Sequence, residues 1–348
     1  MDTDDPGDGA DGLAGRQSTM ADVARRAQVS TATVSYFLSG RSELMRRVGA
    51  EAQERISLAV RELGYVQNKT ARHLRLQRTE RICVLLPRLG IPFADTMAQD
   101  IEAAAHRRGF ATIVVTAADY DGFRHVVHEI EGGLADGLIA DADGLTVAEL
   151  TELLEPLERL GKACLMIHPA ATGRAFSVVT HGRLEALKDV LGYIRDRGHR
   201  RIAYVQNDTG RHDPRSAAVR AFAAENGLPA PIVMEGAEAR GRAVERAREI
   251  AALQPRPSIV VVESDFSAVA MIGEFQRLGL AVPGDIAVIG FGNAEEGFFC
   301  NPRLSTIGPV SLSMTEATEH LLDIITNRVD AGPRQFVVPW TLYPRESG

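Results

Sequence analysis

From Arg81 onward, short apolar runs alternate with amphipathic helical segments, and this alternation most constrains how the chain can fold. Strands are expected at 82–86, 111–116, 137–140, 163–167, 201–205, 259–262 and 286–291. Helical periodicity is expected at 97–107, 123–132, 147–160, 184–197 and 217–226. Because strands separated by helices favour parallel sheets covered on both faces, we predict an α/β fold with two doubly wound lobes.

The stretch before these strands has the pattern of a helix-turn-helix. Thr19 and Asp22 can exchange hydrogen bonds as a capping box that starts a helix at about Met20. After a short break, Ser30 can cap a second helix, in which Val34 faces the first. Four residues of this second helix then face away from the core, where a groove-reading surface would have to lie: Thr31, Ala32, Ser35 and Tyr36.

A third helix is needed, because two helices this short cannot bury enough surface to fold alone. The sequence predicts it over 50–63, with Gly64 as its stop and Tyr65 folded back onto the bundle. Residues 18–67 should therefore form a small all-α helix-turn-helix headpiece.

The charge distribution separates this headpiece from the rest of the chain. Residues 1–17 hold five Asp and one Arg, and we expect them to form a disordered acidic tail. Residues 18–78 carry a net charge of +6, whereas the formal charge of the whole chain is -7. A basic small domain attached to an acidic large one is typical of a nucleic-acid reader joined to a domain of another kind.

Composition and cysteine usage favour a cytoplasmic protein. The chain has 45% apolar and 24% charged residues, and no apolar run approaches the roughly 20 residues of a membrane span. The acidic start lacks the features of a signal peptide. Cys83 and Cys164 lie in apolar strand-like runs and Cys300 in an expected loop, without paired spacing, which indicates a reducing compartment.

Several motifs together resemble the LacI/GalR (lactose-repressor-like) family of bacterial transcription regulators. The headpiece reads VARRAQVSTATVSYFLSG and is followed by ELGYVQNKTARHLRLQRT. Further matches are RGHRRIAYV, VPGDIAVIGF and the closing PRESG. The resemblance implies an effector-sensing and dimerisation domain of periplasmic-binding-protein type over 79–348, with a cleft between its lobes. Its N-lobe would span about 79–178 plus 308–335, and its C-lobe about 179–307 plus 336–348.

The resemblance also implies which residues contact DNA. The basic segment 68–78 would be a hinge helix that orders on operator DNA and inserts Leu74 into the minor groove. Thr31, Ala32 and Tyr36 occupy the positions that read bases. Many relatives have Arg at the place of Tyr36, and Tyr36 cannot grip guanine as Arg does, so it would supply stacking or methyl contact unless it packs inside the headpiece. The full expected set is Thr19, Ser30, Thr31, Ala32, Thr33, Ser35, Tyr36, Arg46, Arg47, Asn68, Arg72 and Leu74.

For the sensor cleft, the resemblance assigns effector binding to Arg215 and Asp265, with Phe93 and Asp95 on the other lobe. Arg215 could instead pair with a carboxylate, and Asp265 could cap a helix. His181 and Asn293 stand where many relatives carry polar or acidic cleft residues. Because carboxylates that usually hold sugar hydroxyls are missing, a less sugar-like ligand, or none, is an open alternative.

We therefore predict a homodimeric, or tetrameric, repressor that binds a pseudo-palindromic operator under control of a sugar or other polar metabolite. The alternatives are an effector-independent regulator, a solute-binding protein without DNA function, and an enzyme. No nucleophile elbow or phosphate loop supports the enzyme, and we expect no cofactor. His125 and His128 have a spacing that could support a metal, but no third ligand is evident, so we expect no metal site.

Overall fold

The computed structural model describes residues 18–38, 42–66, 78–117, 119–169, 176–207, 214–327 and 332–348. The chain divides into two compact units, with the division after Gln77. The expected hinge, with Asn68, Arg72 and Leu74, and the acidic tail lie outside the described residues.

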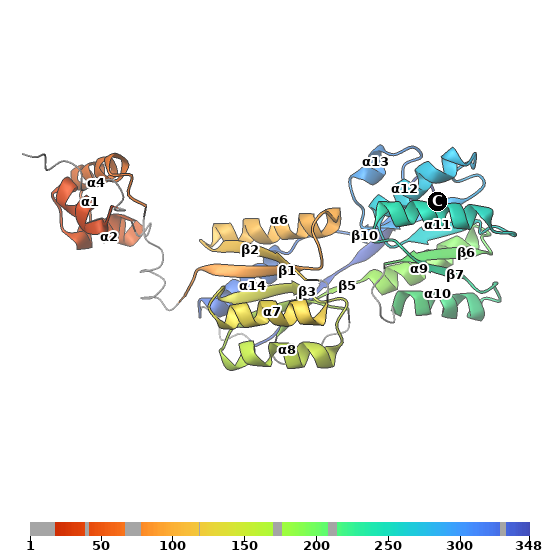
Figure 1. Cartoon of the computed structure of the whole chain (residues 1–348), viewed down its shortest axis with the longest axis horizontal. Helices are drawn as coiled ribbons and strands as arrows, with labels where there is room; N and C mark the ends of the chain where they lie inside the picture. Colours follow the sequence, from red (N-terminus) through yellow and green to blue (C-terminus); the bar gives the residue numbers. More distant parts are fainter. Residues whose placement is uncertain are drawn as a thin grey trace, which may run out of the picture. The chain divides into compact units, whose positions relative to one another are not determined.

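The first unit is the headpiece, a small helical bundle (Figure 1). Its helices are α1 (Met20–Ala27), α2 (Thr31–Leu38), α3 (Ser42–Met45) and α4 (Ala50–Glu62). The capping box is confirmed: the Asp22 amide donates to Thr19 Oγ1 at 3.3 Å, and the Thr19 amide donates to the Asp22 carboxylate at 2.9 Å. Ser30 Oγ accepts from the Thr33 amide at 3.1 Å, which confirms the second cap. The short helix α3 was not predicted.

The headpiece core joins all three long helices. Val23, Val34 and Ile56 are fully buried in it, and Tyr65 folds back onto it as expected. The turn between α1 and α2 is made by Gln28, whose φ of 55° is left-handed. Arg55 reaches across from α4 and donates to the Ala27 carbonyl at 3.1 Å, so the end of α1 is tied to the third helix.

The second unit contains two parallel-sheet lobes, as the alternation predicted (Figure 1). The sheet of the first lobe has the strand order β11-β5-β4-β3-β1-β2 and is covered by α6 and α14 on one face and α7 and α8 on the other. Its strands are β1 (Arg81–Leu86), β2 (Ala111–Thr116), β3 (Gly137–Asp141), β4 (Ala163–Ile167), β5 (Ser177–His181) and β11 (Gln335–Val338). Its helices are α6 (Pro92–Arg107), α7 (Tyr120–Glu131), α8 (Val147–Arg159) and α14 (Thr315–Ile325).

The sheet of the second lobe has the order β12-β10-β9-β8-β6-β7. Only the β10–β12 pair is antiparallel among the described strand pairs. The strands of this second sheet are β6 (Ile202–Gln206), β7 (Ile232–Glu235), β8 (Ile259–Val262), β9 (Ala287–Phe291), β10 (Ser305–Pro309) and β12 (Trp340–Tyr343). Its helices are α9 (Arg183–Asp196), α10 (Pro214–Glu225), α11 (Arg240–Ala252), α12 (Asp265–Arg277) and α13 (Glu296–Phe299).

Each central strand supplies both cores of its lobe, because alternate side chains point to opposite faces. In β1, Ile82 and Val84 pack under α6 and α14, whereas Cys83 and Leu85 pack under α7 and α8. Cys164 is buried in the same core as Cys83, in agreement with a packing role for both.

The chain passes between the lobes three times, after β5, after β10 and after β11. The expected boundary at 178 falls inside β5, and the one at 335 falls at the first residue of β11. Both strands pair within the first sheet, because Val338 lies opposite His181. The crossings therefore lie after His181 and after Val338.

No helix among the described residues is long and apolar enough to span a bilayer.

Candidate functional site

The outer face of α2 presents the residues expected to read bases. Thr31 and Ala32 are exposed and Tyr36 is 38% exposed, whereas Val34 on the opposite face is buried. Ser35 is partly buried, and the Thr33 hydroxyl lies 2.8 Å from Ser30 Oγ. The side chains of Thr19 and Ser30 cap helices, and the Thr19 amide donates to Asp22, so contact with a phosphate at these positions would come from other backbone amides of the two helix starts.

Arg46 and Arg47 follow α3 and are both exposed. Two other arginines of the headpiece are engaged within it: Arg26 pairs with Glu62 at 2.6 Å, and Arg25 with Asp22 at 2.8 Å. Arg46 and Arg47 therefore remain available to a phosphate backbone.

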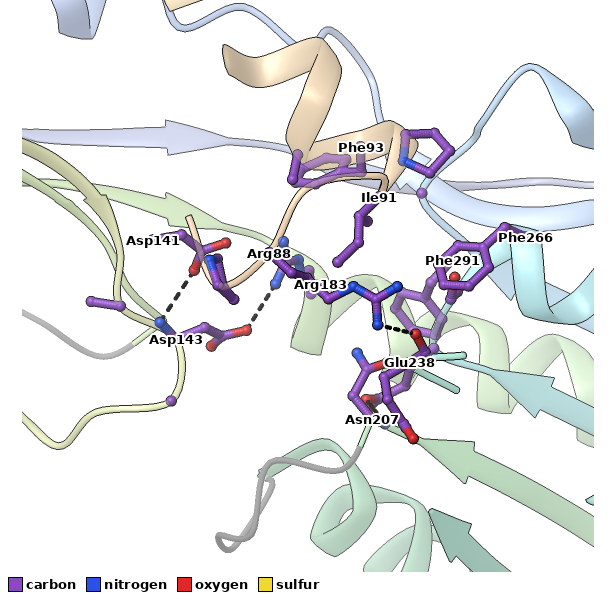
Figure 2. A pocket seen from close by; sticks show the side chains of 18 of the residues that line it. Arg88, Ile91, Phe93, Asp141, Asp143, Arg183, Asn207, Glu238, Phe266 and Phe291 are labelled. Atoms are coloured by element: carbon purple, nitrogen blue, oxygen red, sulfur yellow. Dashed lines mark hydrogen bonds and ion pairs between the residues drawn. The ribbon is translucent and has the colours of Figure 1, made fainter. Parts of the chain in front are cut away.

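In the second unit, a cavity of about 490 Å³ lies between the two lobes. It is lined by residues at the carboxyl ends of β1, β3, β8 and β9, where open α/β sheets bind ligands. Figure 2 shows Asp141 and Asp143 on one side of it and Glu238, Phe266 and Phe291 on the other.

Asp143, in the loop after β3, carries the ionic contact between the lobes. Arg183, the first residue of α9 in the second lobe, donates to it at 2.9 Å, and Arg215 of α10 lies 4.0 Å from the same oxygen. Arg88 after β1 adds a third link by donating to the Glu238 carbonyl (Figure 2). Two guanidinium groups of one lobe thus converge on one carboxylate of the other.

Arg215 also forms an ion pair inside its own lobe. Its Nε lies 3.1 Å from Glu263, whose side chain is fully buried. The same carboxylate accepts from the Tyr204 hydroxyl and from the Asn207 amide. The alternative that Arg215 pairs with a carboxylate is therefore correct, and the guanidinium is still on the cavity wall.

Asp141, at the end of β3, lies beside Asp143. The Asp143 amide donates to it at 3.3 Å. Burial and the neighbouring Asp143 charge raise the pKa of Asp141 to about 6, although Arg183 and Arg215 act in the opposite direction.

Aromatic side chains form one wall of the cavity. The Phe93 and Trp340 rings lie 5.4 Å apart, and the Arg183 guanidinium lies 5.2 Å from the first and 5.1 Å from the second. His181 lies behind them and is not on the cavity wall: the Trp340 indole donates to its Nδ1 at 3.1 Å. Burial, and then the Arg183 charge, lower the pKa of His181 to about 2, so the ring is neutral.

Asp265 lies on the cavity wall, but both of its carboxylate oxygens are engaged. Thr306 Oγ1 donates to one at 2.6 Å, and the Ala294 amide donates to the other at 2.6 Å. The side chain is 1% exposed, and burial raises its pKa to about 6 against the effect of these hydrogen bonds. Asp265 therefore holds the turn after β9 to strand β10.

Of the six residues expected to bind an effector, the cavity brings together Phe93, Arg215 and Asp265. Asp95 and Asn293 line a neighbouring hollow instead. Asp95 accepts from the Gly90 amide at 3.2 Å, and Asn293 Oδ1 accepts from Arg345 at 2.6 Å. Neither side chain reaches the main cavity.

The sequence reasoning missed much of the cavity wall. Asp141 and Asp143 directly follow a predicted strand, and Arg183 directly follows β5, which was not predicted. Trp340 is the single tryptophan of the chain and could have been singled out on that ground.

Exposed His125 and His128 lie on α7, where His128 is 3.4 Å from Glu131.

Comparison with known families and proteins agrees with both units. Residues 19–68 match the model of bacterial regulatory proteins of the lacI family, and residues 191–348 match a periplasmic binding protein-like domain. The HTH-type transcriptional repressor PurR of Vibrio campbellii is 30% identical over 295 residues, covering 83% of this chain and 86% of that protein. Catabolite control protein A of Priestia megaterium is 26% identical over 296 residues, with the same coverage.

Solved structures show the same architecture. A lac repressor dimer bound to operator and the anti-inducer ONPF is 19% identical, with a TM-score of 0.81 over 95% of this chain and 99% of that one. A complex of the transcriptional regulator CelR with cellobiose is 22% identical, with a TM-score of 0.65 over 95% of this chain and 100% of that one. On these findings, the chain belongs to the LacI family of bacterial regulatory proteins.

Proposed function

We propose that the chain is a cytoplasmic repressor that binds a pseudo-palindromic operator as a homodimer and is controlled by a small molecule in its interlobe cavity. The observation that carries this proposal is the helix-turn-helix, whose second helix keeps Val34 in the core and leaves Thr31 and Ala32 exposed. The PurR relative is a repressor by name, and residues 18–78 are the basic part of the chain.

In this proposal, α2 enters the major groove. Thr31, Ala32 and Tyr36 contact base edges, and Ser35 and Thr33 lie beside them on the same helix. Arg46, Arg47 and backbone amides of the helix starts capped by Thr19 and Ser30 contact phosphates, which fix the register without reading sequence.

The segment with Asn68, Arg72 and Leu74 would complete the contact. Arg72 would contact phosphate, and Leu74 would enter the minor groove at the centre of the operator. A bend produced there offsets the cost of unstacking, because the bent duplex contacts more protein. Two such segments, one from each protomer, are needed for a symmetric site.

Control would come from the cavity between the lobes. Phe93 and Arg215 contact the ligand, and Asp265 holds the turn that shapes the wall. A ligand that prefers one relative position of the lobes shifts the population toward it, and the change in operator affinity cannot exceed its differential affinity for the two states.

A selection from randomised duplexes tests the DNA-binding proposal. The full chain should enrich a pseudo-palindrome, and Tyr36→Arg should change the enriched bases because Arg can donate two hydrogen bonds to guanine. A matched control is Leu58→Arg, which adds the same charge at an exposed position of α4.

The control variant should enrich the same sequence as the unchanged protein. Enrichment of no sequence by the full chain would refute the regulator, and unchanged preference in Tyr36→Arg would remove Tyr36 from the reading surface.

A further inference from the structure

Carboxylates outnumber arginines on the described part of the cavity wall. The arginines are Arg88, Arg183 and Arg215, and the carboxylates are Asp119, Asp141, Asp143, Glu238, Glu263 and Asp265. Two of these carboxylates are compensated from elsewhere: Glu238 accepts from Arg242 at 3.0 Å, and Asp265 accepts from Thr306 and the Ala294 amide, with Arg345 nearby.

Among the other four carboxylates, Asp119 and Asp141 form no ion pair with an arginine of the described wall. Asp143 pairs with Arg183, Glu263 pairs with Arg215, and Asp119 caps α7 through the Gly122 amide at 2.8 Å. Asp119 is exposed to solvent, whereas Asp141 is partly buried, and its one hydrogen bond within the described part of the chain comes from the Asp143 amide.

Arg183 and Arg215 lie near enough to lower the pKa of Asp141, but no arginine on the described wall forms an ion pair or hydrogen bond with it. Arg183 and Arg215 are already bound to other carboxylates, and Arg88 is exposed and donates to the Glu238 carbonyl. A half-buried carboxylate without an ion-pair contact is costly, and burial together with the Asp143 charge raises the pKa of Asp141. A cation brought in by the ligand would remove this cost.

The walls of the cavity suit a flat apolar body that carries such a cation. The aromatic lining residues are Phe93, Phe123, Phe266, Phe291 and Trp340. These ring faces already attract guanidinium groups: Arg183 lies over Phe93 and Trp340, and Arg240 lies 4.9 Å from the centre of the Phe266 ring. Aromatic faces attract cations because of their quadrupole, and apolar walls bury the body of the ligand.

We propose that the interlobe cavity binds an organic cation: a protonated amine on a flat, aromatic or similarly apolar body, with the ammonium group donating to Asp141. The inference rests on the proposed role of this unit as a sensor, and it names the class of effector. The ammonium group donates the further hydrogen bonds that the Asp141 carboxylate can accept. The apolar body of the ligand lies against Phe93, Phe291 and Trp340.

Three indoles of one shape and different charge test this assignment on the full chain. Tryptamine is a cation at neutral pH, tryptophol is neutral, and indole-3-acetate is an anion. Measured by calorimetry at millimolar concentration, tryptamine should bind about tenfold more tightly than tryptophol, because a hydrogen bond between charged groups replaces a neutral one. Indole-3-acetate should bind more weakly than either.

Asp141→Asn should remove the preference for tryptamine over tryptophol, because the amide keeps the shape and loses the charge. A matched control is Asp121→Asn, an exposed position on α7 that pairs with Arg124 at 3.0 Å and does not line the cavity. The control should keep the preference.

The same preference should depend on pH. Because Asp141 is protonated below a pKa of about 6 and the amine stays charged, tryptamine should bind about tenfold more tightly at pH 7.5 than at pH 5. Tryptophol should show no such change. The charged and titratable groups near Asp141 are Asp143 in its own loop, Arg183 on α9, Arg215 on α10, and Arg88 and His168 at the ends of β1 and β4.

The neutral sugar methyl glucoside is measured in the same way for comparison. The organic-cation assignment would be overturned if indole-3-acetate bound as tightly as tryptamine or more tightly, if methyl glucoside bound more tightly than tryptamine, or if no indole bound. Operator binding by the same preparation is measured separately. A chain that binds DNA but no amine refutes this inference alone, whereas a chain that binds tryptamine but no duplex refutes the proposed regulator.

Discussion

Gly290 in β9 shows how tightly single residues are fixed around the cavity. A Cβ at this position would lie 2.2 Å from Asp265 Oδ1 and 2.9 Å from the Leu304 side chain. The carboxylate cannot move aside, because Thr306 and the Ala294 amide hold it. We therefore expect Gly290→Ala to destabilise the chain by about 1–3 kcal/mol, as overpacking of a rigid core does, and a urea titration of the full chain measures the loss.

Gly192→Ala is the matched control for this change. Gly192 lies in α9, and a Cβ there would meet nothing within 4 Å. Alanine favours a helix over glycine by about 1 kcal/mol, so this variant should be as stable as the unchanged chain or more so. If Gly290→Ala unfolds at the same urea concentration as Gly192→Ala, the prediction that a Cβ at position 290 clashes with Asp265 is wrong.

The sequence predicted some of the single residues that line the interlobe cavity and missed others for a physical reason. Arg215 was found because the family resemblance marks an arginine at the start of this helix, and Phe93 was found because it follows the first strand of the unit. His181, Asp95 and Asn293 share such positions, yet their side chains are held by Trp340, the Gly90 amide and Arg345. Position along the chain predicts which sheet edge a residue reaches. The direction of its side chain depends on contacts from distant segments.

Among elements, the loop after β3 and the starts of α9 and α10 form an interlobe ion-pair cluster of Asp143, Arg183 and Arg215. The Asp143 side chain is 33% exposed and that of Arg183 is 19% exposed, so solvent screens the pair only partly. Asp143→Asn should therefore cost about 1 kcal/mol or less in stability. It should also increase hydrogen exchange at the amides of both lobes that face the cavity, because the lobes then separate more often.

Asp121→Asn again provides the control, because its pair with Arg124 lies on one helix and both side chains are largely exposed. This variant should leave exchange in both lobes unchanged. Faster exchange confined to the β3–α8 loop in Asp143→Asn would mean that the cluster stabilises a loop and not the closed cleft.

Burial explains most of the strands that the sequence predicted or missed; the exceptions are the half-exposed edge strand β2, which was predicted, and the buried strands β5 and β10, which were missed. The inner strands β1, β3, β4, β8 and β9 are almost fully buried and were found as apolar runs. The strands β7, β11 and β12 lie at or near sheet edges, have mostly half-exposed residues, and were missed. An edge strand shows no continuous apolar pattern, because one side of it contacts water.

For the whole molecule, the separation of charge predicts how DNA binding depends on salt. Residues 18–78 carry ten Arg and one Lys against one Asp and four Glu, while the chain as a whole is negative. A regulator that contacts phosphates through this part should lose operator affinity steeply as salt increases, because bound counterions are released. The periplasmic-type unit is acidic, so it should not contribute to this salt dependence.

Arg47→Ala tests which part of the molecule provides the phosphate contacts. Two copies of Arg47 in a dimer would contact two phosphates, so the variant should reduce the slope of log affinity against log salt by about 1.8. The control is Arg159→Ala on α8 of the sensor unit, where the arginine pairs with Glu155 at 3.9 Å. The slope should not change in this control. Filter binding or fluorescence anisotropy between about 50 and 200 mM salt measures both slopes. An equal reduction in the two variants would mean that the acidic unit also contacts the duplex, and no reduction in Arg47→Ala would remove that residue from the phosphate-contacting set.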